Sequence, residues 1–180
     1  MKKTFLLLIC FLSVFVTHGQ EPAPPTQEWC EWAFRQLPDH RDIAEVDANA
    51  FSVDFYTLLK IAFEIDEWEH KKNPGDIGAE FLFYWYAGNG DSPLSFRGHT
   101  IQYKVGKVQD GKTSVEITIR IPERSPNKPI TLRFTMYLVY ENNAWRIDDW
   151  FDWNDGMNGS MRKALRGYIR WYANQIPENP

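Results

Sequence analysis

The sequence predicts an α+β domain in which helices pack on the concave face of a curved antiparallel sheet. Apolar residues recur every three or four positions in the first part of the chain and again near its end, a period typical of amphipathic helices. Between about residues 100 and 151, apolar and polar residues alternate instead, which is typical of strands with one solvated face. Because short turns join these strands, we expect an antiparallel sheet whose apolar face the helices cover.

Size and composition are those of one domain with its own core. The chain has 180 residues, of which 43% are hydrophobic and 24% charged, and this is enough to bury a core without cross-links. A net charge of -4 offers no basic footprint for nucleic acid, so we expect no nucleic-acid partner. Aromatic residues make up 16% of the chain, which raises the question of whether some rings line a ligand site in addition to the core.

Residues 1–19 have the three parts of a secretory signal peptide. Lys2 and Lys3 precede an apolar run over residues 5–16, and small residues precede an expected cleavage site near Gly19. The run is shorter than the roughly 20 residues that cross a bilayer. We therefore expect export to the periplasm or the outside of the cell, with no membrane span after cleavage, in preference to a retained N-terminal anchor.

Cleavage leaves a single cysteine, Cys30, which has no partner for a disulfide within the chain. No histidine or lysine lies beside it to lower the thiol pKa, so we expect a small buried apolar side chain rather than a nucleophile or an intermolecular bridge. Residues 20–25, with three prolines, are expected to form a stiff spacer without secondary structure. The single α+β domain is then expected over residues 26–180.

Three amphipathic segments predict the helices. Thr26 is placed to cap the first, which is short. The second extends over about residues 51–72 and the last over about residues 160–176. Trp68 and Tyr172 fall in the apolar stripes of these two longer helices, which predicts that both face inward.

Four strands with a period of two follow the second helix. They are expected at Thr100–Val108, Thr113–Ile121, Ile130–Tyr140 and Ala144–Phe151. Turns are expected at Asp110-Gly111, over residues 122–129 and at Asn142-Asn143. The aromatic segment over residues 77–87, which precedes the strands, fits either a third helix or a buried strand.

Three short segments carry a resemblance to a known family. They are GDSPLSFRGHTIQYKVGKV over residues 90–108, the strand end WRIDD over residues 145–149 and the helix start GSMR over residues 159–162. Together with the order of elements over residues 51–176, they resemble the nuclear transport factor 2-like superfamily, and within it a family of secreted bacterial proteins of unknown function. The resemblance implies a cone of sheet and helices around a pocket. The superfamily contains isomerases, dehydratases and binding modules, so no reaction follows from it.

Asp149 and Tyr103 are the candidates for catalysis. Strict alternation places Asp149 on the same face as Trp145, toward the covered side, where burial would raise the pKa of its carboxyl and suit it to act as a general acid or oxyanion donor. Tyr103 is the candidate partner. The alternative is structural, because an aspartate at a strand end commonly caps a turn or helix and a core tyrosine commonly keeps its hydroxyl at the rim. Asp148, on the opposite face, is expected to be solvated.

The sequence predicts neither a metal site nor a cofactor. The acidic segment over residues 148–159 lacks the ligand spacing of a calcium loop. His40, His70 and His99 have no cysteine partners and no close spacing, which argues against zinc. Phosphate loops, dinucleotide fingerprints and nucleophile elbows are missing from the sequence.

These observations favour an exported, non-catalytic binding module with an aromatic-lined pocket for a small molecule or a peptide. The expected lining residues are Tyr84, Tyr86, Tyr103, Trp145 and Asp149. One alternative is an envelope protein-interaction or inhibitor and immunity-type protein that binds through Arg162, Arg166 and Arg170 on the last helix. A second alternative is a cofactor-free isomerase, dehydratase or hydrolase that uses Asp149 and Tyr103. An oligomer is compatible with each of these functions.

Overall fold

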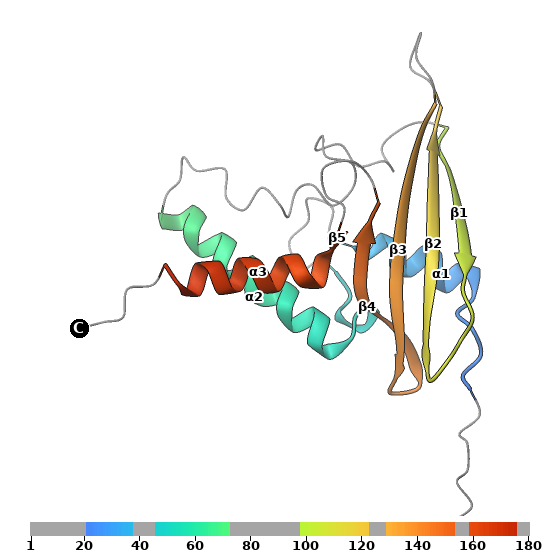
Figure 1. Ribbon diagram of the computed structural model, residues 1–180, viewed down its shortest axis with the longest axis horizontal. Coiled ribbons are helices and arrows are strands. Elements are labelled where there is room, and N and C mark those ends of the chain that lie inside the picture. The colour runs from blue at the N-terminus through green and yellow to red at the C-terminus, as the bar shows by residue number, and fades with distance from the viewer. Residues whose placement is uncertain (1–20, 38–45, 73–97, 123–128, 154–158, 176–180) are drawn as a thin grey trace, which may run out of the picture.

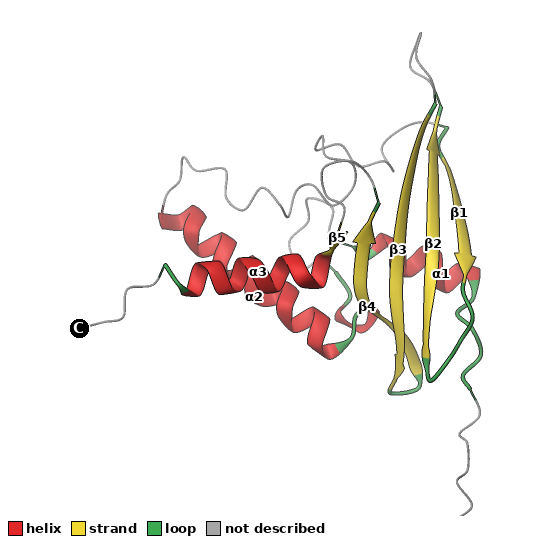
Figure 2. Ribbon diagram, viewed as in Figure 1, coloured by secondary structure: helices red, strands yellow, loops and turns green. Residues whose placement is uncertain are grey.

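The computed structural model describes residues 21–37, 46–72, 98–122, 129–153 and 159–175. In this part of the chain, the helices are α1 (Gln27–Arg35), the short 3-10 helix η2 (Ala48–Ala50), α2 (Val53–Lys72) and α3 (Met161–Ala173). The strands are β1 (Thr100–Val105), β2 (Lys112–Ile121), β3 (Ile130–Glu141), β4 (Ala144–Asp152) and β5 (Gly159–Ser160). The predicted α+β class with an antiparallel sheet is confirmed (Figures 1 and 2). None of the helices in these ranges is both long enough and apolar enough to cross a membrane.

The sheet is a meander in the order β1-β2-β3-β4-β5, and every neighbouring pair is antiparallel. Two of its turns are the ones that the sequence predicts. Asp110 and Gly111 have φ angles of 51° and 66°, and Asn142 and Asn143 have φ angles of 53° and 61°. Two successive residues with positive φ make the hairpin turn whose twist matches that of the strands, and aspartate, asparagine and glycine tolerate this conformation best.

A β-bulge interrupts β4. Ile147 pairs with Leu138 and Asp149 pairs with Tyr137, so that Asp148 is an extra residue with no partner across the ladder. An extra residue inverts the alternation beyond it. Trp150 and Asp152 therefore continue the buried set of β4, and the prediction that Asp149 shares the face of Trp145 is wrong.

Helix α1 lies against one face of the sheet (Figure 1). Its N-terminus is capped as predicted, because the Thr26 Oγ1 accepts a hydrogen bond from the Trp29 backbone N–H over 3.2 Å. The fully buried Phe34 places its ring centroid 6.1 Å from that of Tyr103 and 5.9 Å from that of Trp150. Trp150 in turn stacks on Phe134 at 4.8 Å. Aromatic side chains thus occupy the space between α1 and the sheet.

Helices α2 and α3 pack on one another beside β4 and extend away from the sheet (Figure 1). Both begin at this edge of the sheet: the Ser52 N–H donates to the Ile147 carbonyl over 2.8 Å just before α2, and β5 pairs with β4 and continues directly into α3. Phe55, Leu59 and Ala62 are buried in the half of α2 near the sheet. The helical cover is thus divided between α1 on the face and the α2–α3 pair at the edge.

Candidate functional site

Two of the predicted site residues, Tyr84 and Tyr86, lie outside the described residues. The same is true of the whole segment over residues 77–87, for which the sequence allowed a helix or a strand. The structure places the other three predicted lining residues, Tyr103, Trp145 and Asp149, and each has a partner within the fold.

Asp149 caps the start of α3. Its carboxylate accepts hydrogen bonds from the Trp150 N–H over 2.8 Å, the Ser160 hydroxyl over 2.6 Å and the Arg162 N–H over 2.8 Å. The Ser160 Oγ itself accepts from the Lys163 N–H over 3.1 Å, as an N-cap does. The two side chains together satisfy N–H groups of the first turn, which have no partner within a helix. These contacts agree with the structural alternative for Asp149, in which the aspartate caps a helix.

Asp148, the bulged residue, joins the starts of α2 and α3. It forms an ion pair with the Arg162 guanidinium and accepts a hydrogen bond from the Ser52 hydroxyl over 2.6 Å. The Ser52 Oγ also accepts from the Phe55 N–H over 3.2 Å at the beginning of α2. The prediction that Asp148 is simply solvated is wrong. Arg162, with 16% of its side chain exposed, points inward toward Asp148 and Ser52. Arg166 and Arg170 remain exposed.

Tyr103 and Asp149 do not meet. Tyr103 is paired with the buried Ile117 on the face that α1 covers, whereas Asp149 is paired with Tyr137, which is 41% exposed on the opposite face. Burial is the main cause that raises the pKa of the Tyr103 hydroxyl well above its ordinary value, so this phenol stays protonated. The structure therefore does not bring the two candidate catalytic groups to one site.

Trp145 is covered by the segment before α1. Its indole N–H donates to the Ala23 carbonyl over 2.8 Å, and its ring meets that of Tyr140 edge-on at 5.3 Å. The Glu21 carboxylate accepts from the N–H groups of the Asp110-Gly111 turn over 2.8 and 3.2 Å. Residues 21–25 thus have no regular secondary structure, as expected of the spacer. They are nevertheless bound to the domain, and the Trp145 indole N–H is already hydrogen-bonded to them.

Cys30 belongs to α1 and is fully buried. Burial raises the pKa of its thiol to about 11, so the nucleophilic thiolate is scarce at neutral pH. This placement agrees with the prediction of a small buried apolar side chain.

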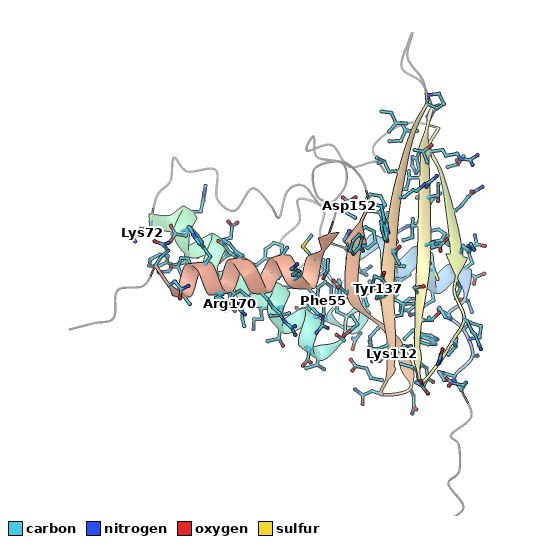
Figure 3. The ribbon with its side chains drawn as sticks, in the orientation of Figure 1. Phe55, Lys72, Lys112, Tyr137, Asp152 and Arg170 are labelled. Atoms are coloured by element: carbon cyan, nitrogen blue, oxygen red, sulfur yellow. The ribbon has the colours of Figure 1, made fainter. Side chains whose placement is uncertain are left out.

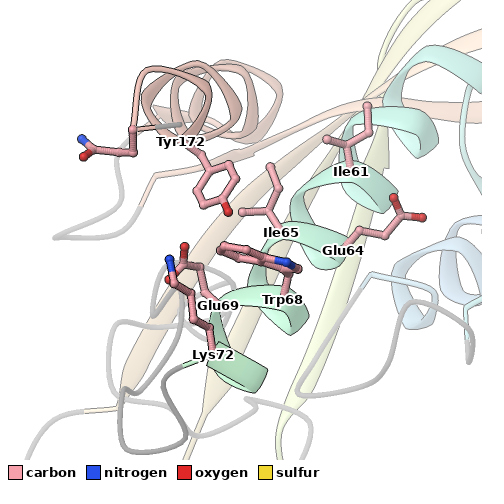
Figure 4. Close-up of a pocket in the computed structure, with 8 residues that line it drawn as sticks. Ile61, Glu64, Ile65, Trp68, Glu69, Lys72 and Tyr172 are labelled. Atoms are coloured by element: carbon pink, nitrogen blue, oxygen red, sulfur yellow. The ribbon is translucent and has the colours of Figure 1, made fainter. Parts of the chain in front are cut away.

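An aromatic-lined groove in the described part of the chain lies elsewhere, between the far ends of α2 and α3. A groove of about 540 Å³ is lined by Ile61, Glu64, Ile65, Trp68, Glu69, Lys72, Tyr172 and Gln175 (Figure 4). Isoleucine side chains and two rings form its apolar part, and two carboxylates and one ammonium group lie around it. This combination of an apolar surface with a few charged groups is typical of ligand sites.

Trp68 is the central residue of this groove. Its side chain is 50% exposed, its ring meets that of Tyr172 edge-on at 5.9 Å, and the Lys72 Nζ lies 4.7 Å from its ring centroid. Burial and the neighbouring Glu69 carboxylate raise the pKa of the Tyr172 hydroxyl. The ring of Trp68 is therefore held from two sides while about half of its surface remains available.

The sequence pattern places Trp68 and Tyr172 on inward stripes, but it does not identify them as a site. Helix α2 has 20 residues and is therefore about 30 Å long, and only its first half lies against buried core residues. The sequence signal is the apolar row of Ile61, Ile65 and Trp68, which are spaced by four and three residues along α2. Their exposure depends on where the sheet ends, which the periodicity of a helix does not encode.

Within the described ranges, no three histidine, cysteine, aspartate or glutamate side chains gather as a metal site. Comparison with known proteins adds no identity to this geometry, because neither a protein-family model nor a curated protein sequence matches the chain.

Proposed function

We propose that this protein is an exported, non-catalytic binding module that holds a peptide segment in the groove between α2 and α3. The observation that carries the proposal is the half-exposed Trp68, fixed between Tyr172 and Lys72 in an apolar groove. An exposed large ring that its neighbours hold in place binds at a low entropic cost, because little of its motion remains to be lost.

The charges around the groove define the chemistry of the peptide. Glu64, which forms an ion pair with Lys60 at 3.8 Å, and Glu69 provide two carboxylates. Lys72 provides one ammonium group, which already lies over the Trp68 ring. The two carboxylates favour a cation on the occupant. The occupant is therefore an apolar segment that carries lysine or arginine, with its aliphatic side chains on Ile61 and Ile65 and its basic group near Glu64 and Glu69.

The positions of Tyr103 and Asp149 on opposite faces of the sheet support a binding function over catalysis. We also propose membership of the nuclear transport factor 2-like superfamily, on the order of helices, meander and final helix. Export rests on the signal-like sequence of residues 1–19.

The proposal is tested by the affinity of a fluorescein-labelled peptide of alternating leucine and lysine, measured by fluorescence anisotropy. We expect Trp68→Ala to weaken binding about tenfold or more, because a central aromatic anchor dominates such sites. Trp171→Ala is the matched control: Trp171 is 57% exposed on α3 and is not one of the residues that line the groove. Equal effects of the two substitutions would contradict the proposal.

The charge requirement is tested separately. The double variant Glu64→Gln, Glu69→Gln is expected to weaken the leucine–lysine peptide several-fold and to leave a leucine–glutamine peptide unchanged, because opposite charges at a partly exposed site contribute modestly. A leucine–glutamate peptide that binds more tightly than the leucine–lysine peptide to the unaltered protein would show that the chemistry is assigned wrongly.

A further inference from the structure

The face of the sheet turned away from α1 carries a second depression. It has a volume of about 570 Å³, and its polar lining includes Gln102, Thr118, Arg120, Thr131, Arg133 and Trp153. These side chains come from three neighbouring strands and the residue that follows β4. They belong neither to the α2–α3 groove nor to the aromatic core.

The register of the strands sets these polar groups in rows. Thr100, Arg120 and Thr131 are in one row across β1, β2 and β3, and Gln102, Thr118 and Arg133 are in the next. Side chains that face each other across antiparallel strands are about 5 Å apart. Lys112 and Tyr137 are on the same face nearer the hairpin ends (Figure 3). The result is a broad surface with regularly spaced hydroxyl, amide and guanidinium groups.

Trp153 stands beside these rows as a fixed platform. Its indole N–H donates to the Thr135 Oγ1 over 2.9 Å, and its ring centroid is 4.3 Å from that of Phe151. Even so, 52% of the side chain is exposed. Because its polar atom is already bonded within the protein, the ring offers an apolar face whose orientation is set before a ligand arrives.

The depression is also locally cationic on an acidic protein. Arg120 and Arg133 contribute two guanidinium groups, while Glu116 contributes one carboxylate, which forms an ion pair with Lys104 at 3.1 Å. The whole chain carries a net charge of -4. A guanidinium fork matches the geometry of a carboxylate, so an anionic group is the natural complement of this surface.

We propose that this depression binds a carboxylated sugar chain. The Trp153 ring stacks on the apolar C–H face of one sugar ring, the threonine and glutamine side chains hydrogen-bond to sugar hydroxyls, and Arg120 and Arg133 bind carboxylates. A single exposed ring beside a flat field of hydroxyl groups fits a hydroxyl-rich chain better than a nucleic acid, for which successive aromatic platforms and a strongly basic surface are the rule. This site is independent of the peptide groove, and either assignment can fail alone.

The test uses two forms of one probe: oligogalacturonate, and the same oligosaccharide after its carboxyl groups have been reduced to alcohols. Isothermal titration calorimetry on the mature protein is expected to detect the carboxylated form, with the reduced form at least about tenfold weaker, because the arginine contacts are lost. Absence of binding by oligogalacturonate, or equal binding of the two forms, would overturn the proposal.

Two variants assign the site. Trp153→Ala is expected to weaken oligogalacturonate about tenfold or more. Arg120→Gln, at an exposed position where folding is little affected, is expected to weaken oligogalacturonate several-fold and to leave the reduced form unchanged. Arg170→Gln, an equal change of charge on α3, is the control, and circular dichroism reports whether each variant is folded. Full affinity in a folded Arg120→Gln protein, or tighter binding of single-stranded DNA than of oligogalacturonate, would overturn the assignment.

Discussion

The interface between α1 and the sheet differs from the far end of the α2–α3 pair although both are rich in aromatic residues. In the first, Phe34, Phe134 and Trp150 are almost fully buried and fill the space between two layers. In the second, Trp68 and its neighbours line a groove and Trp68 stays half exposed. The difference teaches that aromatic content alone does not locate a site. A ring becomes available where a helix continues past the layer that would cover it.

The largest loss of stability is expected from a substitution in the buried interface between α1 and the sheet. Phe34→Ala removes a fully buried ring that contacts both Tyr103 and Trp150, and a phenylalanine truncated to alanine in a core costs about 3–5 kcal/mol. Urea denaturation followed by circular dichroism measures this loss. A cost below about 1 kcal/mol would show that α1 is not part of the core.

Asp149 provides the next largest effect. Asp149→Ala removes two hydrogen bonds at the start of α3 and one to the neighbouring Trp150 N–H, and loss of a cap with its part-buried partners costs about 1–3 kcal/mol. The same denaturation experiment measures it. A variant of unchanged stability would contradict the capping role and return Asp149 to the candidates for chemistry.

Cys30 is expected to make the free energy of unfolding depend on pH in the alkaline range. The thiol ionises near 9.0 when it is unperturbed, but burial raises its pKa to about 11 in the folded protein. The unfolded chain therefore loses this proton first as the pH rises. The stability linked to this thiol is complete below about pH 9 and is lost between about pH 9 and pH 11. Cys30→Ala is expected to flatten the fall in the free energy of unfolding over that window, and an identical slope in both proteins would contradict the burial of a protonated thiol.

The smallest effect on stability is expected at the groove. Trp68→Ala removes a side chain that is half exposed at the end of α2, so its cost is expected to be about 1 kcal/mol or less, as for most surface positions. Measured beside Phe34→Ala, this variant sharpens the contrast between the two regions. A cost as large as that of Phe34→Ala would mean that the groove is a second core.

Much of the sheet could be predicted from the sequence because its signals are local. Alternation of apolar and polar residues over 113–121 is sufficient to place a strand. The turns follow from residues that readily adopt positive φ, at Asp110-Gly111 and Asn142-Asn143. The bulge at Asp148 could not be predicted from alternation, because the partners of Asp148 are Ser52, 96 residues away, and Arg162 in another element. One extra residue then reversed the expected direction of Asp149.

The site could be predicted less well than the fold. Periodicity correctly marks Trp68 and Tyr172 as the apolar side of two helices, but the same stripe describes a buried contact and an open groove. Only the position of α2 relative to the sheet distinguishes them. Likewise, Trp145 looks available in the sequence, but Ala23 from the proline-rich segment covers its indole N–H.

The most direct test of the peptide groove is a titration of the isotope-labelled protein with the leucine–lysine peptide, observed through the indole N–H signals of its tryptophans by NMR. The Trp68 signal is assigned with Trp68→Phe. We predict that the Trp68 signal shifts with the bound fraction while those of Trp145 and Trp153 stay in place, because the first indole N–H is bonded to Ala23 and the second lies on the sheet. A Trp68 signal that does not move when the peptide is bound would contradict the account.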